Sequence, residues 1–266
     1  MGKKTISNIK EIAKSSKITM LTAYEFIFAS ILSSCNVDII LVGDSLASLF
    51  SGHENTLPAT VDEMIYHTKA VVRGAGESMV VTDMPFMSYH INVDETKRNA
   101  GRIIKESGAQ GVKIEGGSKL ILDNISALSE IDIPVMAHLG LTPQSIHKIG
   151  GYKVQGKGSE SAKKLLADAK RVESAGAFSL VLECVPELLA KEITESINIP
   201  TIGIGAGKYC SGQVLVTQDI LGMYDKVRPK FVKVYKEIGK EIKETVNIFI
   251  DDVKDGKFPS KEHTFK

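Results

Sequence analysis

The chain alternates short apolar runs with longer amphipathic segments along most of its length. Seven short, mainly apolar runs of four to six residues are present, most of them rich in Val, Ile or Leu: Ile18–Thr22, Ile39–Val42, Met79–Thr82, Gly111–Ile114, Val135–His138, Ser179–Leu182 and Ile199–Ile204. Runs that are apolar on both faces are typical of strands in a parallel sheet covered by helices. An eighth and weaker strand is expected at Gln213–Val216.

The segments between these runs carry the signals of helices. Val93–Ser107 begins beside Asp94, a candidate N-cap, and ends at Gly108, a candidate C-cap glycine. Ser159–Ala175 has apolar residues at helical spacing and ends at Gly176. The pattern therefore predicts repeated strand–helix units.

The tail is predicted to form one amphipathic helix over about residues 231–253. Six apolar residues lie on one face at helical spacing: Phe231, Val234, Tyr235, Ile238, Ile242 and Val246. We expect this helix to close a single domain that spans residues 1–266.

Two architectures fit a strand–helix alternation, a (β/α)8 TIM barrel and a doubly wound open sheet. Division of the 266 residues by eight gives about 33 residues per unit, a suitable length for a barrel. Polar side chains follow or end five consecutive runs: Asp44 and Ser45, Asp83, Lys113 and Glu115, His138, and Glu183. In a barrel these strand ends meet at one rim, whereas an open sheet spreads them along a line. The pattern thus favours the α/β class and a (β/α)8 barrel.

Each of these residues also has a purely structural interpretation. Asp44 or Asp83, taken alone, is more often a helix cap or turn residue than a ligand. Glu115 could cap the helix that follows, and His138 could be a buried histidine with a backbone partner. Five successive strands that end in ionisable groups make a shared site the stronger interpretation.

The side chains of this cluster suit a hard metal ion. Asp44, Asp83 and Glu115 offer carboxylate oxygens, which favour Mg²⁺ over zinc, and the sequence has no HExxH motif. A 2-oxo acid could chelate such an ion while Lys113 neutralises its carboxylate. Glu183 would then be free to act as the base that removes a proton next to the carbonyl.

The glycine-rich segment Gly203–Lys208 matches neither nucleotide-binding pattern. Ile202 stands where a P-loop needs its first glycine, and the third glycine comes one residue early for a dinucleotide fold. We interpret the segment as a tight turn after the seventh strand, where a ligand or another part of the chain approaches closely.

Composition adds little beyond a location. The formal net charge is +1 with both signs evenly mixed, which does not indicate a nucleic-acid partner. No apolar run reaches the length of a membrane span. Three cysteines without CxxC spacing and the absence of a signal-peptide pattern predict a reduced, soluble, cytoplasmic protein.

Ten ordered stretches closely resemble the ketopantoate hydroxymethyltransferase family. They are LTAYEF (Leu21–Phe26), LVGDSL (Leu41–Leu46), GHENTLPATV (Gly52–Val61), YHTKAVVRGA (Tyr66–Ala75), DMPFMSY (Asp83–Tyr89), VKIEGG (Val112–Gly117), HLGLTPQS (His138–Ser145), GGYKVQGKG (Gly150–Gly158), LECVP (Leu182–Pro186) and IPTIGIGAG (Ile199–Gly207). The resemblance covers the chain from near residue 20 to past residue 215.

The resemblance implies a (β/α)8 barrel that acts in pantothenate biosynthesis. It implies transfer of a one-carbon unit from 5,10-methylenetetrahydrofolate to 3-methyl-2-oxobutanoate through a Mg²⁺-chelated enolate, with one Mg²⁺ per subunit. By the same resemblance, Asp44 and Asp83 bind the metal and lie beside the bound oxo acid, and Glu115 completes the metal site through water. A homo-oligomer, with a decamer as the family's form, is implied as well.

The remaining roles also come from the resemblance. Ser45 and Lys113 would hold the oxo acid, and Glu183 would be the general base. His138 would line the substrate pocket in a role that the sequence does not define. Two alternatives stay open: a Mg²⁺-dependent lyase of the phosphoenolpyruvate/isocitrate-lyase type, and a catalytically silent barrel that serves as a scaffold.

Overall fold

The computed structural model describes residues 2–151, 153–224 and 229–265 of the chain. The chain folds into two compact units, Met1–Leu215 and Val216–Lys266. Among the described residues, the first unit contains eight strands, whereas the second contains two helices and a short 3₁₀ turn. A single domain over residues 1–266 stays a prediction.

Eight parallel strands close into a barrel in which each strand pairs with its neighbours in sequence and β8 pairs with β1. The strands are β1 Ile18–Thr22, β2 Ile39–Val42, β3 Met79–Asp83, β4 Gly111–Glu115, β5 Val135–Gly140, β6 Ser179–Glu183, β7 Thr201–Ile204 and β8 Gly212–Leu215. The predicted (β/α)8 barrel and its seven apolar runs are confirmed, and the eighth strand lies one residue before its predicted place.

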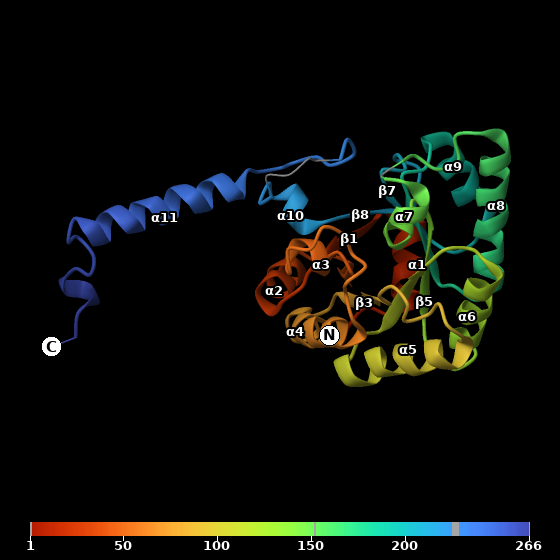
Figure 1. The fold of residues 1–266 in the computed structure, drawn as a ribbon, viewed down its shortest axis with the longest axis horizontal. Helices are drawn as coiled ribbons and strands as arrows, with labels where there is room; N and C mark the ends of the chain where they lie inside the picture. Colours follow the sequence, from red (N-terminus) through yellow and green to blue (C-terminus); the bar gives the residue numbers. More distant parts are fainter. Residues whose placement is uncertain (1, 152, 225–228, 266) are drawn as a thin grey trace. The chain divides into compact units, whose positions relative to one another are not determined.

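Most helices of the first unit cover the outside of the barrel (Figure 1), and one of them, α1, packs against its interior. They are α1 Ile6–Ser15, α2 Phe26–Ser34, α3 Leu46–Leu49, α4 Val61–Gly74, α5 Val93–Ser107, α6 Lys119–Ser129, α7 Ile146–Ile149, α8 Ser159–Ser174 and α9 Glu187–Ser196, with the 3₁₀ turn η1 at Pro143–Ser145. The fully described segment 205–211 joins β7 to β8 without a helix. Gly205 and Gly207 have positive φ there, which confirms the predicted tight turn.

Two helix boundaries differ from the sequence prediction. The N-cap of α5 is Asn92, whose side chain accepts a hydrogen bond from the backbone of Glu95, so the prediction of Asp94 was wrong. Asp94 instead lies in the acidic first turn, where its negative charge interacts favourably with the positive end of the helix dipole. Helix α8 ends at Ser174, one residue earlier than predicted, and Gly176 with φ +103° follows in the loop.

The barrel interior is filled by alternate residues of the strands. On β2, Ile39 and Leu41 pack inside the barrel, whereas Ile40 and Val42 face the helices. This alternation follows from the two-residue period of a strand. Ile9 of α1 is fully buried in the same interior cluster as Ile18 of β1, so α1 belongs to the packing inside the barrel.

The second unit contains α10 Thr217–Ile220, α11 Ile238–Lys254 and the 3₁₀ turn η2 at Lys261–His263. The predicted tail helix is present, but it begins at Ile238 and not at Phe231. The backbone nitrogens of Tyr235 and Ile238 donate to the carbonyls of Ile220 and Leu221, which pairs this segment with α10 in place of a further helical turn. None of the residues of α11 is buried.

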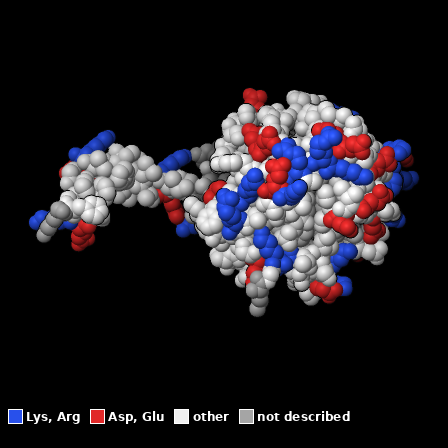
Figure 2. All heavy atoms as spheres, turned by 90° about the horizontal axis from the view of Figure 1, so that it is seen from below, with Lys and Arg blue, Asp and Glu red and all other residues white. Residues whose placement is uncertain are grey.

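The surface carries both signs of charge. On the face of the barrel unit seen in Figure 2, Lys and Arg side chains are interspersed with Asp and Glu, as the mixed charge of the sequence suggests. Among the described residues, no helix combines the length and apolarity that a bilayer span requires.

Candidate active site

All seven predicted residues lie at the carboxyl ends of the barrel strands. Asp83, Glu115 and Glu183 are the last residues of β3, β4 and β6. Asp44 and Ser45 follow β2, Lys113 lies within β4, and His138 lies within β5. Six of the seven are buried, and Ser45 is partly exposed. The barrel therefore brings together residues that are up to 139 positions apart, since Asp44 and Glu183 belong to one site.

Lys113 lies at the centre of the polar cluster. Its ammonium nitrogen is 2.7 Å from Asp83 Oδ1 and 3.9 Å from Glu115 Oε1. The strand register places Lys113 directly beside Asp83, and the two-residue period puts Lys113 and Glu115 on the same face of β4. The other oxygen of Asp83 accepts the backbone N–H of Asp44 at 3.0 Å, which joins the ends of β2 and β3.

His138 lies between two glutamates. Its Nδ1 is 3.6 Å from Glu115 Oε1, and its Nε2 is 3.4 Å from Glu183 Oε2. Both distances exceed those of strong hydrogen bonds. Burial and the nearby charge of Lys113 hold the pKa of His138 well below its ordinary value, so the ring is neutral.

The cluster holds more negative than positive groups. Burial, reinforced by Asp83, raises the pKa of Asp44 to about 7, and burial raises the pKa of Glu183 to about 8. Burial also raises the pKa of Glu115 well above its usual range. Burial alone would lower the pKa of Lys113, but the surrounding carboxylates raise it, so the lysine stays charged.

Two buried loop residues that the sequence analysis did not single out complete the site. Gln144 donates from Nε2 to Asp44 Oδ2 at 2.8 Å, and its backbone nitrogen donates to Glu115 Oε2 at 3.1 Å. Tyr89 donates its hydroxyl to Gln144 Oε1 at 2.7 Å. Both residues lie inside stretches that resemble the family, but neither ends a strand, so the strand-end criterion missed them.

Ser45 is held by the loop after β1. Its hydroxyl lies 2.8 Å from the hydroxyl of Tyr24. The backbone carbonyl of Tyr24 lies 2.6 Å from Nδ1 of the buried His67, which fixes this loop against α4. Tyr24 was likewise missed, because it lies after the end of β1.

The oxygen donors of this cluster are of the kind that binds a divalent cation. Asp44 and Asp83 supply hard oxygens at adjacent strand ends, and Mg²⁺ often uses only one or two carboxylates with water and substrate in the other positions. Four carboxyl groups around one ammonium also leave the site short of positive charge. Within the described part of the chain, however, no three His, Cys, Asp or Glu side chains are placed to hold a metal. Direct ligation by Glu115 therefore stays a prediction.

The backbone around Glu183 is tightly constrained. Cys184, the next residue, has φ +50°, an uncommon value for a residue with a side chain. Gly140, beside Glu183 in the strand register, has φ +97°, and a Cβ there would lie 2.2 Å from the Glu183 carbonyl oxygen. Only glycine allows β5 and β6 to approach this closely at the base candidate.

Gly140→Ala is therefore expected to lower the free energy of unfolding by about 1–3 kcal/mol, through backbone strain and the displaced Glu183 carbonyl. Chemical denaturation would measure the change. The matched control is Gly101→Ala in α5, where a Cβ meets no atom within 4 Å and where alanine should be neutral or stabilising by roughly 0.5–1 kcal/mol. Equal stability of the two variants would contradict this account of Gly140.

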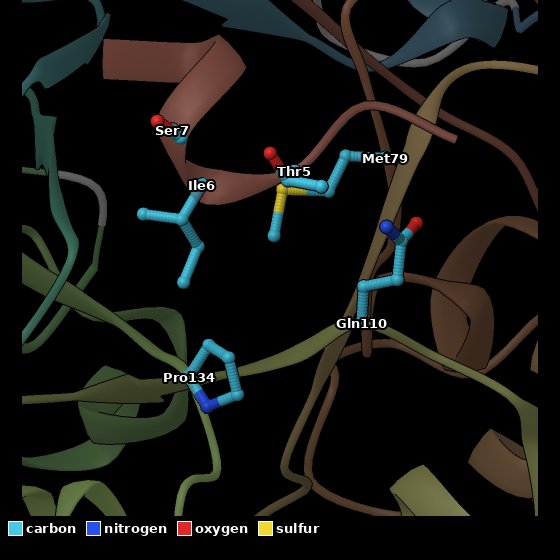
Figure 3. A pocket seen from close by; sticks show the side chains of 6 residues that line it. All are labelled: Thr5, Ile6, Ser7, Met79, Gln110 and Pro134. Atoms are coloured by element: carbon cyan, nitrogen blue, oxygen red, sulfur yellow. The ribbon is translucent and has the colours of Figure 1, made fainter. Parts of the chain in front are cut away.

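A separate cavity of about 300 Å³ lies at the opposite end of the barrel. Figure 3 shows Ile6, Met79 and Pro134 around it, with Thr5 and Ser7 at the start of α1 and Gln110 before β4. Gln110 is already engaged, because it donates to the Lys4 carbonyl and accepts the backbone N–H of Val80. The cavity holds none of the predicted site residues.

The fold is shared with enzymes of a known superfamily. The barrel resembles a 2,3-dimethylmalate lyase described as a PEP mutase/isocitrate lyase superfamily member, with a TM-score of 0.61, 14% identity, and coverage of 97% of this chain and 91% of that one. A phosphonopyruvate hydrolase solved with oxalate and Mg²⁺ matches with a TM-score of 0.62, 11% identity, and coverage of 98% and 93%. At these identities the likeness shows the fold alone.

Sequence comparison is more specific. Proteins named 3-methyl-2-oxobutanoate hydroxymethyltransferase from Geobacter metallireducens and Clostridium botulinum are each 54% identical to the chain. The first match covers 99% of this chain and 98% of the relative, and the second covers 98% and 95%. The family model for ketopantoate hydroxymethyltransferase matches residues 3–261. The chain therefore belongs to the ketopantoate hydroxymethyltransferase family.

Proposed function

We propose that the protein transfers a hydroxymethyl group from 5,10-methylenetetrahydrofolate to 3-methyl-2-oxobutanoate in pantothenate biosynthesis. The products are 2-dehydropantoate and tetrahydrofolate, with one water consumed. Family membership across residues 3–261 supports the reaction. The observation that carries the proposal is the cluster at the strand ends, where the Lys113 ammonium, the Asp44–Asp83 pair and Glu183 meet in one buried site.

The oxo acid is bound by residues of β2 and β4. The charged Lys113 neutralises the substrate carboxylate, and the Ser45 hydroxyl, held by Tyr24, donates a hydrogen bond to it. His138 is neutral and lies between Glu115 and Glu183, so it lines the pocket without adding a charge. These contacts orient the substrate before a proton moves.

Glu183 removes the proton from C3 of the oxo acid. Burial raises its pKa to about 8, which makes its carboxylate a stronger base than that of an exposed glutamate. The C3–H electron pair then forms the bond to the methylene carbon. Both bonds from that carbon to the folate nitrogens break, a water molecule supplies the hydroxyl that replaces them, and the two nitrogens take up one proton from that water and one from solvent. The proton stays on Glu183 and is later returned to solvent.

Asp44 and Asp83 are the residues that would hold Mg²⁺, one ion per subunit, with Glu115 reaching it through water. When bound, the ion would supply Lewis-acid stabilisation to the negative charge that develops on the substrate's keto oxygen. The backbone N–H of Asp44 keeps the Asp83 carboxylate in place, and Lys113 balances its charge from the other side. A cytoplasmic location and a homo-oligomeric assembly, with a decamer as the form that the family suggests, belong to the same proposal.

The test is an assay of 3-methyl-2-oxobutanoate with 5,10-methylenetetrahydrofolate, with and without Mg²⁺. Formation of 2-dehydropantoate that requires both the folate and the metal is the expected result. Cleavage of a 2-oxo acid without folate would favour a lyase of the phosphoenolpyruvate/isocitrate-lyase type. Failure of calorimetry to detect Mg²⁺ or Co²⁺ binding, together with no turnover, would favour a catalytically silent scaffold.

A further inference from the structure

Gln144 lies where the ends of three strands meet. It belongs to the 3₁₀ turn η1 that follows β5, and it is 6% exposed. Its side-chain Nε2 donates to Asp44 Oδ2 at 2.8 Å and to the Met84 carbonyl at 2.9 Å. Its backbone nitrogen donates to Glu115 Oε2 at 3.1 Å. One residue therefore contacts polar groups at the ends of β2, β3 and β4.

The position of Gln144 in the turn explains its free backbone donor. The first N–H groups of a helical turn have no partner within the turn. Pro143 occupies the position before Gln144, where a missing N–H costs nothing. The N–H of Gln144 is therefore available to a group outside the turn, and the Glu115 carboxylate takes it.

The orientation of the amide is fixed by its neighbours. The Tyr89 hydroxyl donates to Oε1 at 2.7 Å and accepts the backbone N–H of Glu115 at 3.2 Å. Tyr89 is itself fully buried, and Asn124 donates to its carbonyl at 2.7 Å. A reversed amide would turn Oε1 toward an oxygen of Asp44 and the carbonyl of Met84, so only one orientation satisfies all partners.

We propose that Gln144 is a positioning residue that prepares the cation site by fixing the carboxylates of Asp44 and Glu115. It occupies one oxygen of each carboxylate with a neutral donor and so sets the direction of the other oxygen. A neutral amide does this without adding to the charge of a cluster already short of positive groups. The inference deepens the proposed function and rests on it for the metal role of Asp44.

The test is Gln144→Met, a variant of similar length that cannot donate to Asp44 but keeps the backbone N–H that Glu115 accepts. Mg²⁺ and Mn²⁺ affinities of the substrate-free protein would be measured by calorimetry, beside KM and kcat for the oxo acid. We expect the cation affinity to fall about 10- to 100-fold, the range for partners that orient metal ligands.

Gln110→Met is the matched control, since its amide makes two hydrogen bonds, against three for Gln144, but lies at the opposite end of the barrel. Its cation affinity should stay within about twofold of the parent, because it contacts no site residue. Tyr89→Phe provides a second, milder variant that keeps Gln144 but frees its Oε1. Tyr89→Phe also removes the acceptor of the Glu115 backbone N–H, and loss of the one hydrogen bond to Gln144 corresponds to a weakening of cation binding of about 2- to 12-fold.

The outcomes separate this inference from the proposed function. Suppose that the parent protein binds the cation and that the folded variants Gln144→Met and Tyr89→Phe bind it equally well. That result would overturn the role of Gln144 and leave the transferase proposal standing. Parent protein that binds no divalent cation would overturn both the metal assignment and this inference. If Gln144→Met does not fold, normal cation affinity in Tyr89→Phe is enough to reject the positioning role of Gln144.

Discussion

Glu183→Gln is expected to stop exchange of the C3 proton of 3-methyl-2-oxobutanoate with solvent while the protein stays folded. Glutamine keeps the shape of the side chain but removes the carboxylate that accepts the proton. A positioned general base typically contributes about 10²- to 10⁴-fold to the rate, so turnover should fall by that amount. Burial raises the pKa of this carboxyl to about 8, which makes its carboxylate a stronger base than that of an exposed glutamate.

Proton exchange in deuterated water, followed by NMR without folate, separates this step from one-carbon transfer. Mg²⁺ affinity and oxo-acid binding should stay near those of the parent, because Asp44, Asp83 and Lys113 are untouched. Glu192→Gln is the control, since Glu192 is exposed on α9, the helix that follows the same strand. Exchange at the parent rate in Glu183→Gln would assign the base to another residue.

The barrel could be predicted because its strands are apolar on both faces. Ile39 and Leu41 pack inside the barrel while Ile40 and Val42 pack against helices, so all four residues of β2 are apolar. The eighth strand was weak for a physical reason. Gly212 and Val214 are buried, but Gln213 is exposed and Leu215 is partly exposed, so this strand is fully buried on one face only.

The tail shows what periodicity alone misses. The apolar spacing of residues 231–253 continues smoothly through Ile238, yet the helix begins only there. The backbone of Tyr235 pairs with Ile220 instead of with a residue four positions earlier. Such a pairing between distant backbone groups leaves no trace in hydrophobic spacing.

Some site residues could be predicted from the sequence and others could not. Glu115 and Glu183 end strands, and a barrel places all such ends at one rim, so they could be predicted from order alone. Gln144 reaches Asp44 across 100 positions from a turn, and its role depends on the geometry of that turn. No spacing rule connects two such residues.

The choice between a transferase and a lyase came from sequence and not from fold. The 2,3-dimethylmalate lyase shares the barrel at 14% identity, whereas the curated transferases are 54% identical across nearly the whole chain. The fold alone therefore does not choose between the two activities. Tests of function must accordingly address individual rim residues.

Asp83→Asn is expected to weaken divalent-cation binding and to lower turnover by at least about 10³-fold. Lewis-acid stabilisation is worth several kcal/mol, and about 1.36 kcal/mol corresponds to each factor of ten. Asparagine keeps one oxygen to accept the backbone N–H of Asp44, but it removes the charge that pairs with Lys113 at 2.7 Å. Turnover would be measured over a range of Mg²⁺ concentrations, which should not restore the parent rate.

The loss of Asp83 also tests the charge balance of the cluster. Lys113 would remain buried beside Glu115 and Asp44, so thermal unfolding should report a loss of stability of up to about 3–5 kcal/mol, the cost of breaking a buried pair, lessened by these remaining carboxyl groups. Asp62→Asn is the control, because Asp62 pairs with Arg102 on the surface, where such a pair contributes about 0–1 kcal/mol. Near-normal turnover of Asp83→Asn at low Mg²⁺ would remove Asp83 from the metal site. The site would then depend on Lys113 and Glu183 without a cation held between β2 and β3.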